Sequence, residues 1–229
     1  MDSLWNGLVR LARVAILSGC ALLFIAAIIV TAEVLIRKAI PDLIEFTTWI
    51  TGIVGIDIAG WSDRTKVWIR DNLTFSGSDE ISGYLFAVGT TWSMAHVLVT
   101  RGHVRIDVLY GQLGPRIRAV FDVIALILLA IFVSAMVERA FDVTWTNTIE
   151  YNRSNTNLRI PFAWSQIPWL AGIVLFFVTL VVALLRSLLA LLRGDWATVA
   201  QTAGVSTQDE EIESELKGLG IQTTHGGKN

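Results

Sequence analysis

Long uncharged apolar stretches alternate with short charged segments along this 229-residue chain. A helix that crosses a bilayer needs roughly 20 mostly apolar residues, because hydrocarbon gives an exposed backbone amide no hydrogen-bond partner. Four stretches have this character, at about residues 12–36, 81–100, 119–137 and 167–185. The pattern predicts an all-α integral membrane protein, with a four-helix membrane domain over residues 1–192 and a polar tail over 193–229.

The first apolar stretch shares one feature with a secretory signal peptide, because Arg10 and Arg13 precede it. It is too long for a signal sequence, however, and no convincing small-residue cleavage site comes before Glu33. We therefore expect an uncleaved membrane span.

The second apolar stretch carries small and polar residues at steps of seven, four and three: Ser82, Gly89, Ser93 and His96. These steps place the four residues along one helical face. Such a face lets helices approach closely and form hydrogen bonds within lipid. This span is therefore expected to lie buried among its neighbours in a bundle.

The segment 38–78, between the first two spans, is predicted to be a long external loop. Its portion 43–59 is partly apolar but contains Glu45 and Asp57. A charged residue near the bilayer centre costs a few kcal/mol, and a helix that lies along the interface avoids that cost. The loop is therefore predicted to hold an amphipathic helical segment, with entry of 43–59 into the membrane as the alternative.

The orientation is predicted from the basic residues that flank the spans. Short flanks on one side hold Arg10, Arg13, Arg101, Arg105, Arg116, Arg118, Arg186 and Arg193. The other side has as many basic residues, but they are spread over two longer loops and offset by acidic residues. The denser side is expected to face the cytoplasm, so both termini and the tail are predicted to be cytoplasmic.

Tryptophan positions agree with these spans, because the amphipathic indole ring prefers the headgroup layer. Of the nine tryptophans, only Trp92 falls in the middle of a span. Trp5 and Trp196 are expected at one interface, and Trp145, Trp164 and Trp169 at the other.

The overall composition narrows the possible functions. The chain is 53% hydrophobic and 17% charged, against about 25% charged residues in an ordinary soluble domain. A formal net charge of -2 leaves no basic surplus for nucleic-acid binding. Because Cys20 is the single cysteine, neither an intrachain disulfide nor a thiolate metal cage is expected.

The residue pattern indicates no catalytic group, no substrate-binding residue and no resident metal or cofactor. His96 and His103 lie seven residues apart, which leaves open a haem-bearing membrane anchor of an oxidoreductase. Ligation by two histidines needs an opposing helix, and the remaining histidine is His225 in the tail. A stand-alone four-helix channel is a second alternative.

Charged and proline residues mark the ends of two spans. Glu33 and Arg37 are four residues apart, in the order that favours an intrahelical ion pair. Pro161 and Pro168 lead into the fourth span, where the first helical turn tolerates proline. All four are candidates for structural roles.

A short motif comes after the second span, within the sequence RGHVRIDVLY at 101–110. It consists of a histidine, an arginine and an aspartate separated by single hydrophobic residues: His103, Arg105 and Asp107. With the charged end of span one and the two prolines, this pattern resembles the small membrane subunit (DctQ type) of tripartite ATP-independent periplasmic (TRAP) transporters. The resemblance covers about residues 12–192, although the family's loop between spans one and two is usually short.

The resemblance implies a non-enzymatic subunit of a transporter in the bacterial inner membrane. In that family a large permease subunit carries an organic acid or similar solute inward with sodium. A periplasmic solute-binding protein delivers the solute, and the small subunit braces the large one. The implied partners are therefore the large permease, the binding protein and the surrounding membrane lipids.

Overall fold

The computed structural model describes residues 2–53, 55, 59–72, 77–100, 114–156 and 158–203. Apart from one isolated bridge between Arg153 and Pro161, the regular structure of these residues is helical. The elements are α1 (Asp2–Val34), η1 (Leu35–Ala39), α2 (Ile40–Ile53), α3 (Ala59–Asn72), α4 (Ser78–Val99), α6 (Pro115–Ile149), α7 (Ala163–Leu192) and α8 (Trp196–Ala203). The all-α prediction is confirmed for the described part of the chain.

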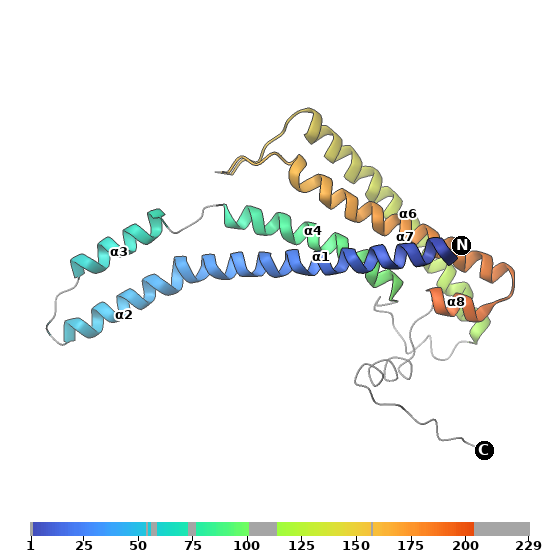
Figure 1. Cartoon of the computed structure of the whole chain (residues 1–229), viewed down its shortest axis with the longest axis horizontal. Helices are drawn as coiled ribbons and strands as arrows, with labels where there is room; N and C mark the ends of the chain where they lie inside the picture. Colours follow the sequence, from blue (N-terminus) through green and yellow to red (C-terminus); the bar gives the residue numbers. More distant parts are fainter. Residues whose placement is uncertain are drawn as a thin grey trace, which may run out of the picture.

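The first helix does not end near residue 36 but continues through η1 into α2. Pro41 lies just beyond η1; it has no backbone N–H, and its ring crowds the carbonyl four residues earlier, that of Arg37. A single π-helical turn takes up this disruption: the Ile40 N–H donates to the Leu35 carbonyl, five residues back. The helix bends there and remains unbroken (Figure 1).

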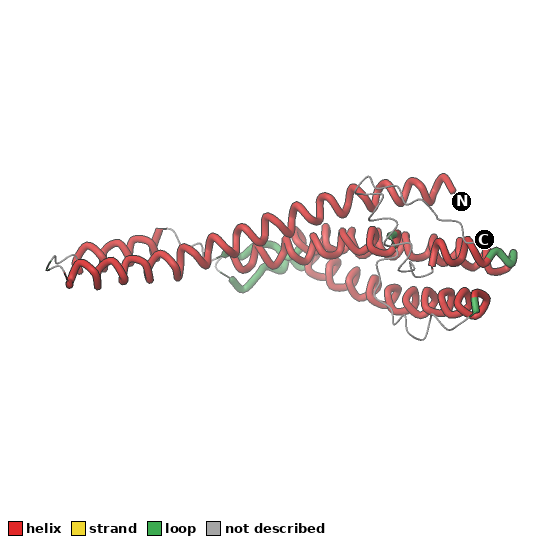
Figure 2. The backbone as a smooth tube through the Cα atoms, turned by 90° about the horizontal axis from the view of Figure 1, so that it is seen from below, coloured by secondary structure: helices red, strands yellow, loops and turns green. Residues whose placement is uncertain are grey.

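The segment 38–78 therefore differs from the predicted loop. Much of it forms a helical hairpin, in which α2 extends α1 and α3 folds back beside α2. The hairpin reaches beyond the other described elements (Figure 2). The first span was predicted to end near residue 36, with Glu33 and Arg37 at that end, whereas the π turn lets the helix continue past Pro41.

The remaining long helices form a row with the order α1, α4, α7, α6. Helix α4 packs between α1 and α7, and α7 also packs against α6, while α8 lies against α6 and α7. The four helices thus form an open layer and not the bundle that was predicted. Helix α1 packs mainly against α4 and has only a small contact with α7. The N-terminus and α8 lie at one end of the molecule, and the α2–α3 hairpin lies at the other (Figure 1).

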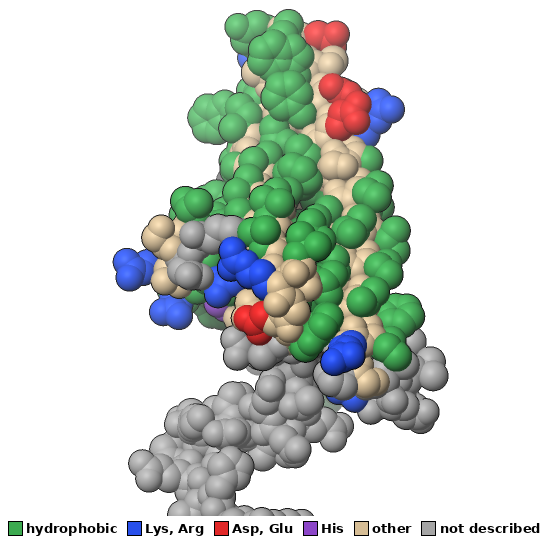
Figure 3. All heavy atoms as spheres, turned by 90° about the vertical axis from the view of Figure 1, so that its right-hand side faces the viewer, with side chains coloured by type: hydrophobic (Ala, Val, Ile, Leu, Met, Phe, Trp, Pro, Cys, Tyr) green, Lys and Arg blue, Asp and Glu red, His purple; other side chains and the backbone are tan. Residues whose placement is uncertain are grey.

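Most large apolar side chains of this row point outward. The largest buried cluster is small and joins α4, α6 and α7 through Leu98, Leu126, Val133, Phe176 and Leu180. By contrast, Phe24 on α1 and Phe132 on α6 remain about two-thirds exposed (69% and 67%). Hydrophobic side chains cover much of the visible flank, and basic side chains gather at the end nearer the viewer (Figure 3). Apolar surface of this extent requires lipid or a protein partner.

By length and composition, three of the described helical stretches can cross a membrane: Ser3–Ile53, Arg116–Ile149 and Ala163–Leu192. Helix α4 has 22 residues, or about 33 Å at 1.5 Å per residue, which is also long enough for a 30 Å hydrocarbon core. Its serines, threonines and glycines leave it without a stretch as apolar as those in the other three. The fourth span therefore stays a prediction.

Candidate functional site: helix contacts and an apolar groove around α4

Helices α1 and α4 meet backbone to backbone at two glycines. A Cβ built on Gly89 would lie 2.8 Å from the Gly19 carbonyl oxygen, and one built on Gly19 would lie 2.7 Å from the Gly89 carbonyl oxygen. Neither position has room for a side chain. On α1 the contact belongs to a buried series of small residues that includes Ala12, Ala15 and Ala26. Small residues at such spacing allow the close approach that stabilises helix pairs in lipid.

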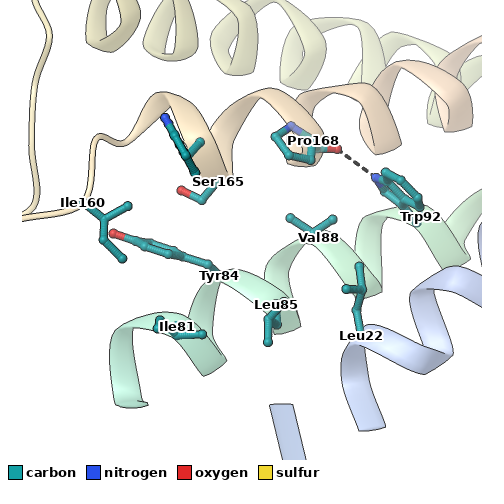
Figure 4. Close-up of a pocket in the computed structure, with 10 residues that line it drawn as sticks. Leu22, Ile81, Tyr84, Leu85, Val88, Trp92, Ile160, Ser165 and Pro168 are labelled. Carbon is teal, nitrogen blue, oxygen red and sulfur yellow. Dashed lines mark hydrogen bonds between the residues drawn. The ribbon is translucent and has the colours of Figure 1, made fainter. Parts of the chain in front are cut away.

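Helices α4 and α7 meet around a third glycine. A Cβ on Gly172 would lie 2.6 Å from the Thr91 Oγ1 atom and 2.7 Å from the Trp92 ring. One turn earlier, the Trp92 Nε1–H donates a hydrogen bond of 2.8 Å to the Pro168 carbonyl oxygen (Figure 4). Trp92, the one tryptophan in the middle of a predicted span, thus uses its polar atom to join two helices.

An apolar groove of about 340 Å³ lies beside this contact. Its walls come from α1, α4, the start of α7 and the turn before α7: Leu22, Ile81, Tyr84, Leu85, Val88, Trp92, Ile160, Trp164, Ser165 and Pro168. Tyr84 points toward Ile160 at one end of the groove, while Trp92 and Pro168 close the other (Figure 4). The groove suits an apolar side chain or an acyl chain and offers no cluster of charged groups.

The start of α4 is tied to the turn between α6 and α7. Glu80 accepts hydrogen bonds from the Thr156 hydroxyl and, at 2.6 Å, from the Tyr84 hydroxyl. These bonds, chiefly the one from Thr156, hold the pKa of the Glu80 carboxyl below its ordinary value, because they favour the ionised form. Pro161 lies in the same turn, bridged to Arg153. The start of α4 and the α6–α7 turn are thereby joined at the end of the groove where Tyr84 lies.

Glu33 and Arg37 lie at the junction of α1 and η1. The Glu33 Oε1 atom is 2.6 Å from the Arg37 Nη2 atom, as an ion pair whose angles lie outside hydrogen-bond geometry. Glu33 is buried (8% exposed), whereas Arg37 is about half exposed (56%). The arginine therefore offsets part of the cost of a buried carboxylate while keeping contact with the surroundings.

We expect this pair to be energetically coupled, by roughly 0.3 to 1 kcal/mol, since one partner is exposed. Arg37→Ala should cost more than Glu33→Ala, because it leaves the buried carboxylate without its cation. The measurement is the thermal stability of E33A, R37A and the double variant. The matched control is Arg139 with Asp142, a 3.7 Å pair exposed on both sides, for which coupling near zero is expected. Fully additive losses at Glu33 and Arg37 would contradict the prediction.

The opposite end of the row carries tryptophan and arginine contacts. The Arg186 guanidinium lies 5.4 Å from the centre of the Trp5 ring, and that of Arg116 lies 6.0 Å from the Trp196 ring. Trp5 belongs to the start of α1 and Trp196 to α8, and these two elements lie at the same end of the molecule, where the tryptophan pattern placed both residues (Figure 1). Stacking of this kind is favourable where water is partly excluded.

The structure distributes the residues singled out by the sequence over several places. Ser82 is buried in α4, and His96 is half-buried near its end, with its Nδ1 atom enclosed and without a hydrogen-bond partner among the described residues. Pro168 lines the groove. His103, Arg105 and Asp107 fall in the segment 101–113, which lies outside the described residues.

The sequence analysis did not identify Gly19 and Gly172, which form close helix contacts. It also did not foresee the hydrogen bond between Trp92 and Pro168. Gly19 sits four residues after Ala15 and seven before Ala26, a small-residue period that was available in the sequence. The role of Trp92 could have been inferred from its position, because a tryptophan in the middle of a span needs an acceptor for its N–H. The searched part of the structure contains no group of three or more potential metal ligands.

Taken together, the long apolar helices and their close contacts define a class of protein: an all-α membrane protein whose helices pack through small residues. The family model for the DctQ component of tripartite ATP-independent periplasmic transporters matches residues 65–190, more than half of the chain. The chain belongs to this family. The match includes α4, α6 and most of α7, and leaves out α1, α2 and the start of α3. Neither the curated proteins nor the solved structures contain a match to it.

Proposed function

We propose that this chain is the scaffold subunit of a sodium-coupled TRAP transporter in the bacterial inner membrane. In this proposal a large permease subunit imports an organic acid or a similar solute, which a periplasmic binding protein delivers. The chain itself carries no solute and catalyses no reaction. Family membership supports the transporter class.

The groove between α1, α4 and α7 is the observation that supports a scaffold most directly. It is an apolar recess framed by three helices whose backbones are locked together by glycine contacts. A rigid recess of this kind can receive side chains of a partner helix at little cost in ordering. We infer that the large permease docks on this side of the row, across the groove and the adjoining faces of α1 and α7.

The helices offer little support for a transport pathway of their own. Solute and sodium sites in transporters are typically formed where helices break near mid-membrane. Here α6 runs for 35 residues without interruption, and α7 contains only Pro168, close to its start. The buried carboxylates Glu33 and Asp122 lie near the ends of their spans.

The test is uptake by a reconstituted transporter with and without this chain. The large permease is expressed alone or together with the chain, purified through a tag and placed in proteoliposomes with its binding protein. Sodium-dependent uptake should be lost when the chain is omitted, and the two subunits should co-purify in mild detergent. Undiminished uptake without the chain, or flux through the chain alone, would contradict the proposal. A haem band in the reduced-minus-oxidised spectrum would favour the oxidoreductase anchor instead.

We further propose four spans, α1, α4, α6 and α7, with both termini in the cytoplasm. The row supports this topology, because the beginning of α1 and α8 lie at the same end of the molecule, where arginines also gather. A reporter active only in the cytoplasm should be active when fused after Gly111 and silent when fused after Ser62. Alkaline phosphatase, which needs the periplasm, should show the reverse. The opposite result at both positions would invert the topology.

A further inference from the structure

In a helical hairpin in water, the large apolar side chains face inward. In the α2–α3 hairpin most of them face outward. Helix α2 makes its main contacts with η1 and α3. Beyond its first two residues, Ile40 and Pro41, which are half-buried, the positions that it buries or half-buries are Ile44, Thr48 and Thr51. Among the residues 60–68 of α3, the most buried is Ser62, at 2% exposure. The threonines bond to carbonyls of their own helix, so they need no outside partner: Thr48 donates to the Ile44 carbonyl and Thr51 to that of Thr47. Hydroxyl groups thus line much of the inside of the hairpin.

Its outer surface is apolar and aromatic. On α2 the exposed side chains are Leu43, Phe46, Trp49, Ile50 and Ile53, which recur at steps of three, three, one and three along one side of the helix. Phe46 and Trp49 stack on each other there, with ring centres 6.2 Å apart. On α3 the exposed large apolar residues are Trp61, Val67 and Trp68. A hairpin with hydroxyls inside and aromatic rings outside is arranged for an apolar environment.

The charges on the hairpin indicate which environment that is. Trp61, Arg64 and Trp68 follow each other at steps of three and four, so an exposed arginine lies between two exposed indoles on one face of α3. Indole rings and snorkelling arginines are typical of the headgroup layer, where an apolar body meets a polar boundary. Lys66 pairs with Glu45 across the hairpin at 3.7 Å, which keeps two further charges next to each other. A wholly apolar face would suit the hydrocarbon core; this mixed face suits the bilayer surface.

The direction of the helices agrees with a surface location. The 51-residue stretch Ser3–Ile53 is about 77 Å long at 1.5 Å per residue, well beyond the 40–45 Å of a whole bilayer. An upright helix of this length would carry α2 far into the water. In the structure α1 leans away from the α6–α7 pair, and α2 leans farther in the same sense beyond η1 (Figure 1). With α6 and α7 crossing the membrane, this lean brings α2 toward the plane of the membrane.

We propose that the α2–α3 hairpin lies on the phospholipid bilayer, with its aromatic outer face in the headgroup layer, on the side of the membrane opposite the N-terminus. The outer face of the hairpin contacts lipid, and the role of the hairpin is to fix the tilt of α1. The inference rests on the hairpin and on its direction relative to the membrane-crossing helices, and it holds whether or not the subunit serves the proposed transporter. The π turn before Pro41 is the point at which the helix leaves the span for the surface.

The test measures contact between the hairpin and lipid in the full-length chain. In a Cys20→Ser background, single cysteines at Ile50, at Ile28 in the first span and at Asn155 in the α6–α7 turn are labelled with an environment-sensitive fluorophore. The chain is placed in nanodiscs of phosphatidylethanolamine and phosphatidylglycerol. Quenching by lipids that carry a doxyl group near the headgroup is then compared with quenching by aqueous iodide. The ratio of lipid to iodide quenching at position 50 is expected to be at least threefold higher than at position 155.

A matched pair of variants tests the aromatic face. Trp61→Glu together with Trp68→Glu should lower lipid quenching at position 50 by at least half, because two carboxylates would be drawn out of the headgroup layer. Thr47→Glu places one carboxylate on an exposed polar position of α2 and should leave quenching nearly unchanged.

Two results would overturn the inference. One is strong iodide quenching at position 50 in nanodiscs, which would place the hairpin in water. The other is protection from both quenchers that appears only after a protein partner is added, which would assign the aromatic face to that partner. Lipid quenching that persists while uptake proves independent of the chain would uphold the hairpin proposal and reject the scaffold proposal.

Discussion

Replacing Gly89 by leucine is expected to separate α1 from α4 and to destabilise the chain severely. The nearest atom in the way belongs to the backbone: a Cβ at position 89 would lie 2.8 Å from the Gly19 carbonyl oxygen, and it would also lie 2.9 Å from the Leu23 side chain. A flexible side chain can move aside, whereas the backbone of a packed helix moves only with the whole helix. Overpacking costs typically 1–3 kcal/mol, and we expect about 3 kcal/mol here because the obstacle is rigid.

Gly83 supplies the control on the same helix. It lies almost two turns earlier and is exposed, and a Cβ there would meet nothing within 4 Å. Gly83→Leu removes a glycine from a helix interior, so it should be neutral or slightly stabilising. The measurement is the temperature at which each purified variant loses its monodisperse peak in size-exclusion chromatography. Equal transition temperatures for G89L and G83L would show that the α1–α4 contact is not needed for folding.

The helical content of the chain can be derived from its sequence, because an apolar stretch in lipid has to satisfy its own backbone. The packing faces were harder to predict. Of the four α4 residues whose spacing predicted one packed face, Ser82 and Gly89 are buried and Ser93 and His96 are half-buried, but nothing in that spacing identifies Gly19 as the partner of Gly89. The pairing of Gly19 with Gly89 depends on the register of two helices far apart in the chain. That register is set by the sum of all the contacts between the two helices.

The continuation of α1 through Pro41 could not be predicted by rules that treat proline as a helix terminator. A π turn adds one residue to a single helical turn and so removes the clash that proline causes. Whether the helix ends at the proline or widens around it depends on the residues beyond the proline. Here the apolar residues after Pro41 continue at helical spacing to Ile53, and helix α3 packs against another side of α2.

The two sides of α4 carry different kinds of side chain. This difference allows effects on the folding of the chain to be distinguished from effects on its assembly with a partner. Toward α1 and α7, α4 presents Gly89 and Thr91 to the glycine contacts, where there is no free space. Toward the groove it presents Ile81, Tyr84, Leu85 and Val88, which border an open volume. Substitutions on the first side should therefore act on stability, and those on the second side should act on binding.

Leu85→Trp is expected to prevent association with the large permease while the chain itself stays folded. Leu85 is half-buried and forms part of the groove wall, so a larger ring at this position takes up part of the roughly 340 Å³ volume and obstructs the groove from within. The groove is open to the outside, and the added ring has room to enter it without displacing the backbone. The thermal transition should thus stay close to that of the wild type, in contrast to G89L.

The measurement is the amount of large permease that co-purifies with the tagged chain in mild detergent. We expect L85W to retain a tenth or less of the wild-type amount, because an obstructed recess no longer admits side chains of the partner. Ile131→Trp is the matched control: it adds the same ring to an apolar position of α6 that is 62% exposed and lies on the outermost helix of the row. That variant should retain the permease in full. Retention by L85W together with loss by I131W would move the docking surface from the groove to the outer face of α6.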